Sequence, residues 1–215
     1  MENARELALE ILLQMERGEG FDGKLITAVL DKYDYLDKRD KAFIKRLTEG
    51  TTERRIELDY HLDHYSTVPV KKMKPFIRSL MRMSVYQIVY MDSVPDSAAC
   101  SEALKLAQKH KFGSLKGYVN GVLRTISRNK ESLSFPDPAK EPVKNLSVRY
   151  SMPEWIVLMW TERYGAESTR KILEGLLKEH PVSVRLNTAL GEKDRETLIK
   201  RMEETGVRLS ANPYP

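Results

Sequence analysis

The sequence predicts a mainly helical protein: an all-α bundle, then a short helical connector, then the start of an α/β unit. Three observations carry this prediction. Apolar residues recur at three- and four-residue spacing over residues 1–131, which indicates amphipathic helices. Prolines among polar residues mark a linker at 132–144. Helical spacing resumes over 145–180, and residues 181–215 combine strand-like alternation with one more helix.

The helices of the expected bundle follow one another with short breaks. Gly18 and Gly20 end the first helix, Pro75 suits the first turn of the fourth, and the break from Val94 to Ser97 precedes the fifth. A pattern over about residues 37–62 is long enough for one extended helix. The apolar positions that define these helices lie, in order, within Ala4–Leu12, Leu25–Val29, Phe43–Leu62, Ile77–Val89, Ala99–Ala107 and Tyr118–Ile126.

The last third of the chain changes character. Ser151 and Glu154 have the spacing of a capping box, which predicts a helix start before Trp155. Further helices are expected at about 167–178 and 194–204, the second of them capped by Gly206. Strands are expected at Val182–Asn187, which alternates with period two, and at Val207–Leu209. Because one strand–helix–strand cannot bury both faces of a sheet, we expect this unit to be incomplete.

Composition excludes several classes of protein. The chain has 215 residues, of which 41% are hydrophobic, and no apolar run approaches the roughly 20 residues that span a bilayer. The acidic start of the sequence is unlike a signal peptide. The single cysteine excludes an intrachain disulfide and argues against a cysteine-based zinc site. We therefore expect a cytoplasmic protein that does not act at a membrane.

The positive charge is concentrated in two windows of the chain. The net charge is only +5, but no Asp or Glu occurs in residues 64–91 or in residues 103–130. Basic side chains recur every four residues in both windows, and such acid-free surfaces are typical of proteins that bind a phosphate backbone. Tyr118 could stack on an unpaired base. Asn120 could serve helix packing or contact a base. The predicted RNA-binding residues are Arg5, Lys74, Arg78, Arg82, Lys109, Lys111, Lys116, Tyr118, Asn120, Arg124 and Arg128.

No other motif predicts a catalytic, cofactor or metal site. His61 and His64 are spaced as two metal ligands on a helix would be, but no third ligand is apparent. Cys100 lies among small residues that suit close helix packing, although its place near a helix start leaves a reactive thiol open. The glycines between residues 113 and 121 follow no strand, so they do not predict a phosphate-binding loop.

Four stretches of the sequence resemble the NusB family in the order in which that family has them. They are Asp37–Gly50, Arg78–Pro95, Ser101–Ala107 and Tyr118–Arg124. This resemblance implies a NusB-like helical domain that binds RNA. NusB itself is a transcription antitermination factor that binds a ribosomal protein, so the resemblance also implies that role.

The chain continues beyond this signature in a way that resembles a second family. Tyr150–Trp155, Trp160, Tyr164–Gly165 and Pro181–Thr188 are similar to the continuation seen in the RsmB (Sun, Fmu) family of S-adenosylmethionine-dependent 5-methylcytosine methyltransferases of small-subunit ribosomal RNA. The resemblance implies an RRM-like segment after the bundle and a catalytic domain, with its cofactor site, after residue 215. Cys100 matches neither of that family's cysteine contexts, so the chain is expected to carry no catalytic residue and no cofactor of its own.

The resulting interpretation is an RNA-recognition module of a ribosomal RNA methyltransferase. Its expected partners are small-subunit ribosomal RNA and its own C-terminal methyltransferase domain, and not DNA. Two alternatives stay open at this point. One is a NusB-type factor in the regulation of transcription, against which the residues from 145 onward argue. The other is a protein-docking scaffold, for which reversing the basic charges would leave RNA affinity unchanged.

Overall fold

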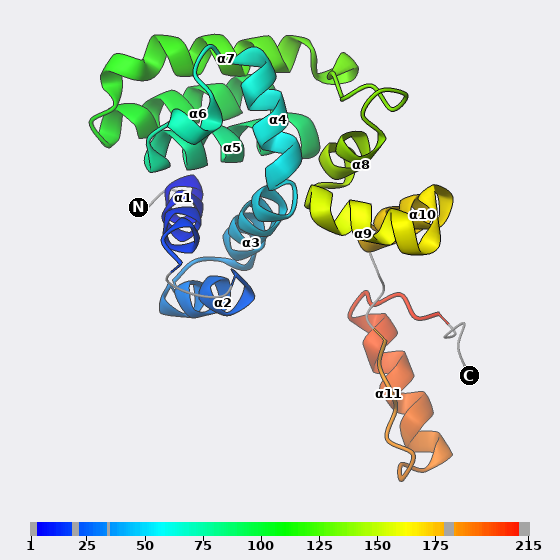
Figure 1. Cartoon of the computed structure of the whole chain (residues 1–215). Helices are drawn as coiled ribbons and strands as arrows, with labels where there is room; N and C mark the ends of the chain where they lie inside the picture. The colour runs from blue at the N-terminus through cyan, green and yellow to red at the C-terminus, as the bar shows by residue number, and fades with distance from the viewer. Residues whose placement is uncertain (1–3, 19–21, 34, 179–182, 211–215) are drawn as a thin grey trace. The chain divides into compact units, whose positions relative to one another are not determined.

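The computed structural model describes residues 4–18, 22–33, 35–178 and 183–210. The chain forms two compact units, one of residues 1–176 and one of residues 177–215. Each unit is described by itself below (Figure 1). None of the described helices is long and apolar enough to cross a bilayer.

The first unit is all helical, as the sequence predicts. Pro75 occupies the first turn of its helix, and the Asp37 carboxylate accepts a hydrogen bond of 2.7 Å from the Asp40 amide at the start of another. The α-helices of this unit are α1 (Ala4–Glu16), α2 (Asp22–Lys32), α3 (Lys38–Glu53), α4 (Arg55–Tyr65), α5 (Pro75–Tyr90), α6 (Asp96–Lys109), α7 (Lys116–Arg128), α8 (Pro142–Tyr150), α9 (Glu154–Tyr164) and α10 (Ala166–Leu176). Short 3₁₀ turns η1 (Val70–Lys72), η2 (Gly113–Leu115) and η3 (Lys130–Ser132) separate some of them.

Helix α5 is the central helix of the bundle. It packs against α1, α3, α4, α6 and α7. Most of its side chains are buried, including the polar ones of Ser79, Ser84 and Gln87. The two serine hydroxyls donate to Glu16 and to the Leu80 carbonyl, and the Gln87 amide donates to the Met83 carbonyl. This central position corrects the expectation that α5 turns a basic face toward solvent.

The long helix expected at residues 37–62 is divided into α3 and α4. The chain turns at Arg54, whose amide donates to the Gly50 carbonyl at 3.0 Å. Gly50 lies against the ring of Tyr86 on α5, and a β-carbon at this position would be 2.0 Å from that ring. The glycine therefore lets α3 approach the central helix at close range.

The segment expected as a linker packs against the bundle. Pro136 is buried and its carbonyl accepts a 2.6 Å hydrogen bond from the Asn145 side chain. The ring of Phe135 lies 5.2 Å from that of His61, with the guanidinium of Arg149 over its face. Helix α8 begins within this segment, with a proline in its first turn. Pro142 thus starts a helix within the segment that was expected to be a linker.

The expected capping box at Ser151 is not formed. Ser151 lies after the end of α8 in a left-handed conformation, with φ of 51°, and helix α9 has no side-chain cap. The Ser151 hydroxyl instead accepts a 3.0 Å hydrogen bond from the Ile56 amide in the first turn of α4. The capping prediction was wrong because that hydroxyl satisfies a distant amide, one of those that every helix start leaves free.

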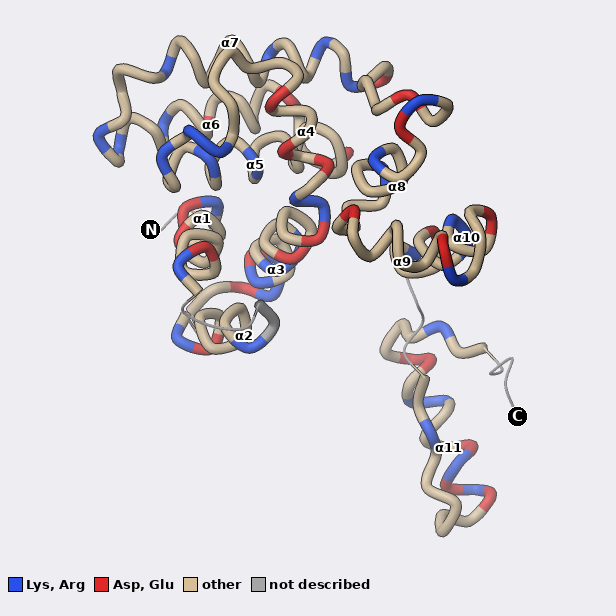
Figure 2. The backbone as a smooth tube through the Cα atoms, in the orientation of Figure 1, with Lys and Arg blue, Asp and Glu red and all other residues tan. Residues whose placement is uncertain are grey.

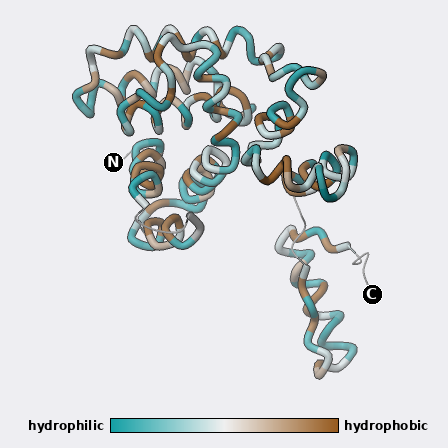
Figure 3. The backbone as a smooth tube through the Cα atoms, in the orientation of Figure 1, coloured by the Kyte–Doolittle hydropathy of each residue, from teal (hydrophilic) through white to brown (hydrophobic). Residues whose placement is uncertain are grey.

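Helix α9 leaves part of its apolar surface uncovered. Trp155 is 66% exposed, and Leu158 and Met159 are also exposed. Figure 3 shows the hydrophobic residues of this helix in brown. Val157 faces the other way and is fully buried. Helix α9 is therefore amphipathic, but Val157 is its one buried residue.

The second unit contains α11 (Glu192–Glu204), whose C-terminus is capped as expected by Gly206 at φ of 86°. The expected strands are not formed: within residues 183–210 the structure has no strand. Val182 lies outside the described residues. Alternation alone does not make a strand, because a strand also needs a hydrogen-bonded neighbour, and the described residues pair with none. The predicted α/β start is thereby corrected.

Candidate nucleic-acid interface

Helices α6 and α7 form an antiparallel hairpin that holds most of the predicted RNA-binding residues. At one end, Asp96 accepts hydrogen bonds from Ser127 at 2.7 Å and Lys130 at 3.2 Å. At the other end, the Lys116 ammonium donates to the Gln108 side chain at 2.8 Å. These contacts align the whole of α7 with α6. The hairpin includes most of the second acid-free window, residues 103–130, and before it the two acids of α6, Asp96 and Glu102.

A cavity of about 660 Å³ lies between these two helices. One wall carries Arg124 and Arg128, both exposed, together with Asn120. The opposite wall has the small side chains of Ser97, Cys100 and Ser101 and the larger Leu104, and Asp96 and Ser127 close one end. The arrangement is a groove with two guanidinium groups along one edge, and it can accept a chain of phosphates.

The Arg124 guanidinium is held without an acidic partner. Its Nε donates to the Asn120 side-chain oxygen at 3.1 Å. Asn120 thus acts within the helix, one turn away, and orients the arginine. Among the described residues, neither Arg124 nor Arg128 forms an ion pair, so both keep their charge available.

The far end of the hairpin carries further predicted cations. Helix α6 ends with Lys111 in a left-handed conformation, φ of 66°, and the Phe112 amide donates back to the Ala107 carbonyl at 2.7 Å. This is a Schellman cap, in which the left-handed position is usually a glycine. A lysine there costs about 1 kcal/mol relative to glycine. The cap leaves the Lys111 side chain exposed.

The same cap creates an aromatic stack that the sequence did not predict. Phe112 lies parallel to Phe76, with 5° between the rings and 4.9 Å between their centroids. Phe76 in turn packs on His110 at 4.8 Å. The Lys74 ammonium lies 5.7 Å from the centre of the Phe112 ring. Phe76 lies in α5 and Phe112 follows α6, 36 positions later, so no local sequence pattern could have predicted their contact.

Glu6 ties this end of the hairpin to α1. Its carboxylate oxygens lie 2.6 Å from the Lys109 ammonium and 2.9 Å from His110 Nε2. Burial alone would raise the pKa of Glu6, but the hydrogen bonds and charges of Lys109 and His110 outweigh it, so the pKa is lowered. Lys109 is therefore engaged by its own chain, although its side chain remains largely exposed.

The basic residues predicted on α5 are used inside the bundle. Arg78 pairs with Glu16, and Arg82 makes a two-pronged contact with Asp59 at 2.6 and 2.7 Å. Both arginines lie in the wall of a second cavity, of about 570 Å³, and their side chains are largely buried. Their acidic partners lie far away in sequence. As a result, their charge is neutralised where the sequence suggested an acid-free surface.

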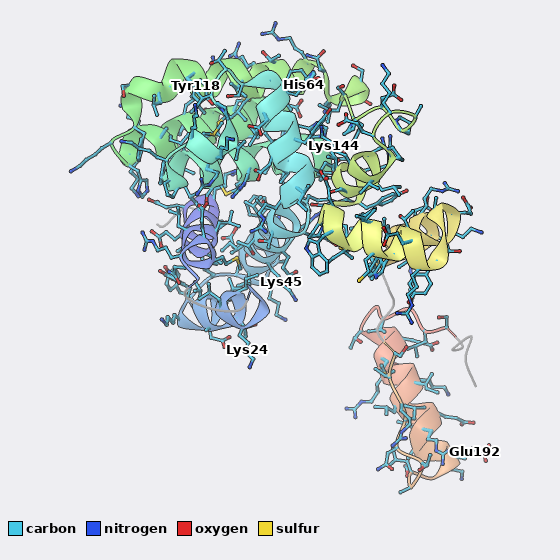
Figure 4. The ribbon with its side chains drawn as sticks, viewed as in Figure 1. Lys24, Lys45, His64, Tyr118, Lys144 and Glu192 are labelled. Carbon is cyan, nitrogen blue, oxygen red and sulfur yellow. The ribbon has the colours of Figure 1, made fainter. Side chains whose placement is uncertain are left out.

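Two more predicted residues also point inward. The Arg5 Nε donates to the Gln87 side chain at 2.7 Å, and its guanidinium lies over the Phe43 ring; burial lowers its pKa, against the charge of Glu102. The side chain of Tyr118, labelled in Figure 4, shares a 2.6 Å hydrogen bond with Ser66 at the end of α4. Tyr118 therefore joins α7 to α4 and does not project as a stacking ring.

The residues weighed as metal ligands or as a thiol nucleophile lie apart from this surface or are buried. His61 is fully buried, and His64 packs on the rings of Tyr60 and Tyr65. No group of three or more potential ligands occurs among the described residues. Cys100 is buried beside the groove, and its thiol pKa is raised, first by burial and then by Asp96, against the effect of Arg124. A raised pKa makes it a poor nucleophile.

The structure thus gathers one part of the predicted set and disperses the rest. Lys111, Lys116, Asn120, Arg124 and Arg128 lie on the α6–α7 hairpin, with Lys109 beside them and Lys74 next to its capped end. Figure 2 shows the basic positions along the tube. Among the described residues, Lys74, Lys111, Lys116, Arg124 and Arg128 form no ion pair with an acidic side chain. We call these five residues the hairpin cations.

Comparisons with known proteins match this architecture over nearly the whole chain. Residues 2–128 match the NusB family, and residues 152–215 match the ferredoxin-like domain of RsmF/B-like methyltransferases. The second match covers helices α9 to α11, the region without a described strand. Over its whole length the chain superposes on 47% of the crystal structure of PH0851, with a TM-score of 0.62 and 16% identity, which shows the fold.

Two curated relatives illustrate the two kinds of match. The chain is 32% identical over 207 residues to a probable ribosomal RNA small subunit methyltransferase B of Bacillus subtilis, covering 96% of this chain and 45% of that protein. It is 33% identical over 144 residues to the transcription antitermination protein NusB of Symbiobacterium thermophilum, covering 63% of this chain and 94% of that protein. The chain therefore spans less than half of the methyltransferase relative and nearly all of the shorter one.

Proposed function

This chain belongs to the NusB family, and from that premise we propose that it is the RNA-binding module of a longer ribosomal RNA methyltransferase. The observation that carries the proposal is the set of hairpin cations. Two of them, Arg124 and Arg128, line the groove of the α6–α7 hairpin, and none of the five has an acidic partner among the described residues. Clustered cations without acidic partners favour a polyanion over a protein surface.

In the proposed role the module positions RNA and performs no chemistry. Contacts to phosphates fix the position and direction of a nucleic acid strand without selecting its sequence. The S-adenosylmethionine cofactor and the reacting cysteines would belong to a methyltransferase domain elsewhere in the protein, which would modify a cytosine of small-subunit ribosomal RNA in the cytoplasm. The names of the relatives that match along the whole chain support this proposal.

A NusB-type antitermination factor is the second candidate. It is favoured by the match to antitermination proteins, which share the bundle with this chain. The match to the ferredoxin-like domain over residues 152–215 argues against this candidate, because the antitermination proteins do not extend over that region. The two candidates predict the same RNA-binding bundle and differ in what the remaining residues join.

The proposed interface is tested with Arg124→Glu combined with Arg128→Glu. Binding to a labelled small-subunit ribosomal RNA hairpin is measured by fluorescence anisotropy across a salt series. We expect the double variant to bind at least about 10-fold more weakly, with a log–log salt slope reduced by roughly 1.5, because two phosphate contacts are lost. Both side chains are exposed, so circular dichroism should show an unchanged fold.

The matched control is Lys24→Glu combined with Lys38→Glu. Both side chains are exposed, on α2 and at the start of α3, and the change in net charge is the same; Lys24 is labelled in Figure 4. An acidic residue in the first turn of α3 also suits that helix. If both double variants weaken binding equally, only net charge matters and the hairpin is not the site. Absence of binding by the unmodified chain would favour a docking scaffold.

A further inference from the structure

The capped end of the α6–α7 hairpin combines aromatic rings with cations. The stack of His110, Phe76 and Phe112 ends at Phe112, which is partly exposed. The Lys74 ammonium lies over this ring, 5.7 Å from its centre, and Lys111 precedes Phe112 in the chain. An aromatic face next to uncommitted cations is the arrangement that proteins use to hold an unpaired nucleotide.

The backbone at the end of α6 adopts a conformation that is unfavourable for the residue that occupies it. Lys111 adopts the left-handed conformation of the helix cap, where a glycine would be unstrained. The cap turns Phe112 back onto Phe76, fixing the ring in a parallel arrangement. A residue held in an unfavourable conformation at a surface points to a role for its side chain. Lys111 supplies a cation next to the ring that a glycine could not.

The charge balance at this end favours an anion. Glu6 contacts the cluster, and both of its oxygens are already bonded, to Lys109 and to His110. Lys74 and Lys111 have no acidic partner among the residues that the structure describes. A ligand that brings phosphates would therefore meet the Lys74 ammonium at the ring and an exposed Lys111 next to it in the chain.

We propose that Phe112 is a stacking platform for an unpaired base of the bound RNA, with Lys74 and Lys111 contacting the phosphates on either side of that base. This inference rests on the proposed RNA-binding function and deepens it. It assigns the capped end of the hairpin to a single-stranded segment, and the α6–α7 groove to the adjoining backbone. The stacking face accepts any base, since every base has an aromatic face.

The first test uses the unmodified chain and a single-stranded RNA octamer that carries one 2-aminopurine. Stacking on an aromatic ring quenches the fluorescence of this base. We expect quenching on binding to the single strand, and weaker binding to a fully paired duplex of equal length. Binding with no quenching at any 2-aminopurine position in the octamer would overturn the platform without reference to any variant.

Two variants of the ring identify the residue. Phe112→Leu keeps an apolar contact to Phe76 but removes the aromatic face, so affinity for the single strand should fall roughly 5- to 100-fold, with loss of quenching. Phe112→Trp keeps an aromatic face and should retain both. Equal quenching by the leucine variant and the unmodified chain would show that the base lies elsewhere. Thermal unfolding followed by circular dichroism confirms that each variant is folded.

A third variant separates charge from stacking. Lys111→Gly relieves the left-handed residue and should lower the salt slope by roughly 0.7 while leaving the quenching in place. An unchanged salt slope would contradict the phosphate contact. If reversal of Arg124 and Arg128 weakens binding but Phe112→Leu does not, the RNA-binding function stands and the platform fails. If the unmodified chain binds no RNA, both fail.

Discussion

At the scale of single residues, Gly50 has the least room for a side chain among the described glycines. A β-carbon there would lie 2.0 Å from the Tyr86 ring, whose side chain is only 8% exposed and stacks on Tyr90. The ring thus has little freedom to withdraw. Overpacking a filled core costs about 1–3 kcal/mol, and occasionally more.

We therefore expect Gly50→Ala to lower the free energy of unfolding by about 2–3 kcal/mol. Chemical denaturation followed by circular dichroism measures this change. Gly121→Ala is the matched control, because Gly121 is also within a helix but a β-carbon there meets nothing within 4 Å. The control should gain about 0.5–1 kcal/mol from the better helix propensity of alanine. Equal effects of the two substitutions would show that the Tyr86 contact is not limiting.

At the scale of elements, Glu6 links the first turn of α1 to the end of α6. The folded state holds its pKa below the ordinary value of 4.5, because Lys109 and His110 hydrogen-bond to the charged form. A depressed carboxylate contributes stability that is present above its unfolded pKa and is lost as the pH falls through the folded pKa.

Glu6→Gln should thus cost about 1–2 kcal/mol at neutral pH, and this difference should shrink as the pH falls from about 5 to about 3. Urea unfolding at several pH values measures both. Glu49→Gln is the control, since Glu49 is half exposed and its ion pair with Lys45 on the same helix is long, at 3.9 Å. A difference between Glu6→Gln and the unmodified chain that stays constant with pH would contradict the link.

Helices α5 and α7 show how far the sequence could predict the interface. Both carry basic residues at four-residue spacing, with Asn120 within the series on α7, and both were expected at the surface. On α7 the acid-free window leaves the two arginines without an acidic partner among the described residues, although Asp96 lies at one end of the groove. On α5 it does not, because Glu16 and Asp59 reach Arg78 and Arg82 from α1 and α4. Periodicity records neighbours along one helix, whereas neutralisation of charge depends on which helices meet in space.

The helical class was predictable for the same reason that the strands were not. Helix bonds are local, so apolar spacing and a first-turn proline such as Pro75 suffice to predict helices. A strand depends on a partner that alternation over residues 182–187 cannot supply. The Phe112 platform could not be predicted either, because the Phe76 ring on α5 and the Phe112 ring after α6 meet only after folding.

At the scale of the whole molecule, the division into two units gives a prediction about folding. Residues 1–176 form a compact unit that holds the central helix, its core and the hairpin cations. The second unit has a single described helix, in which no residue is buried. The first unit therefore contains the buried apolar surface needed to fold alone.

Removal of residues 177–215 should leave thermal unfolding cooperative, with a midpoint within a few degrees of that of the full chain. RNA affinity should change by less than about 3-fold, since the hairpin cations stay in place. Differential scanning calorimetry and the anisotropy assay measure the two effects. Loss of cooperative unfolding would show that the second unit completes the core of the first.

The contact between Gly50 and Tyr86 also bears on how this bundle varies among related chains. The Tyr86 ring occupies the volume that any side chain at position 50 would need, so the two positions share one space. A larger residue at 50 requires a smaller one at 86, and a chain that keeps the tyrosine must keep the glycine. The two positions should therefore co-vary in an alignment of NusB-like domains, recording the crossing of α3 and α5 as a correlated pair.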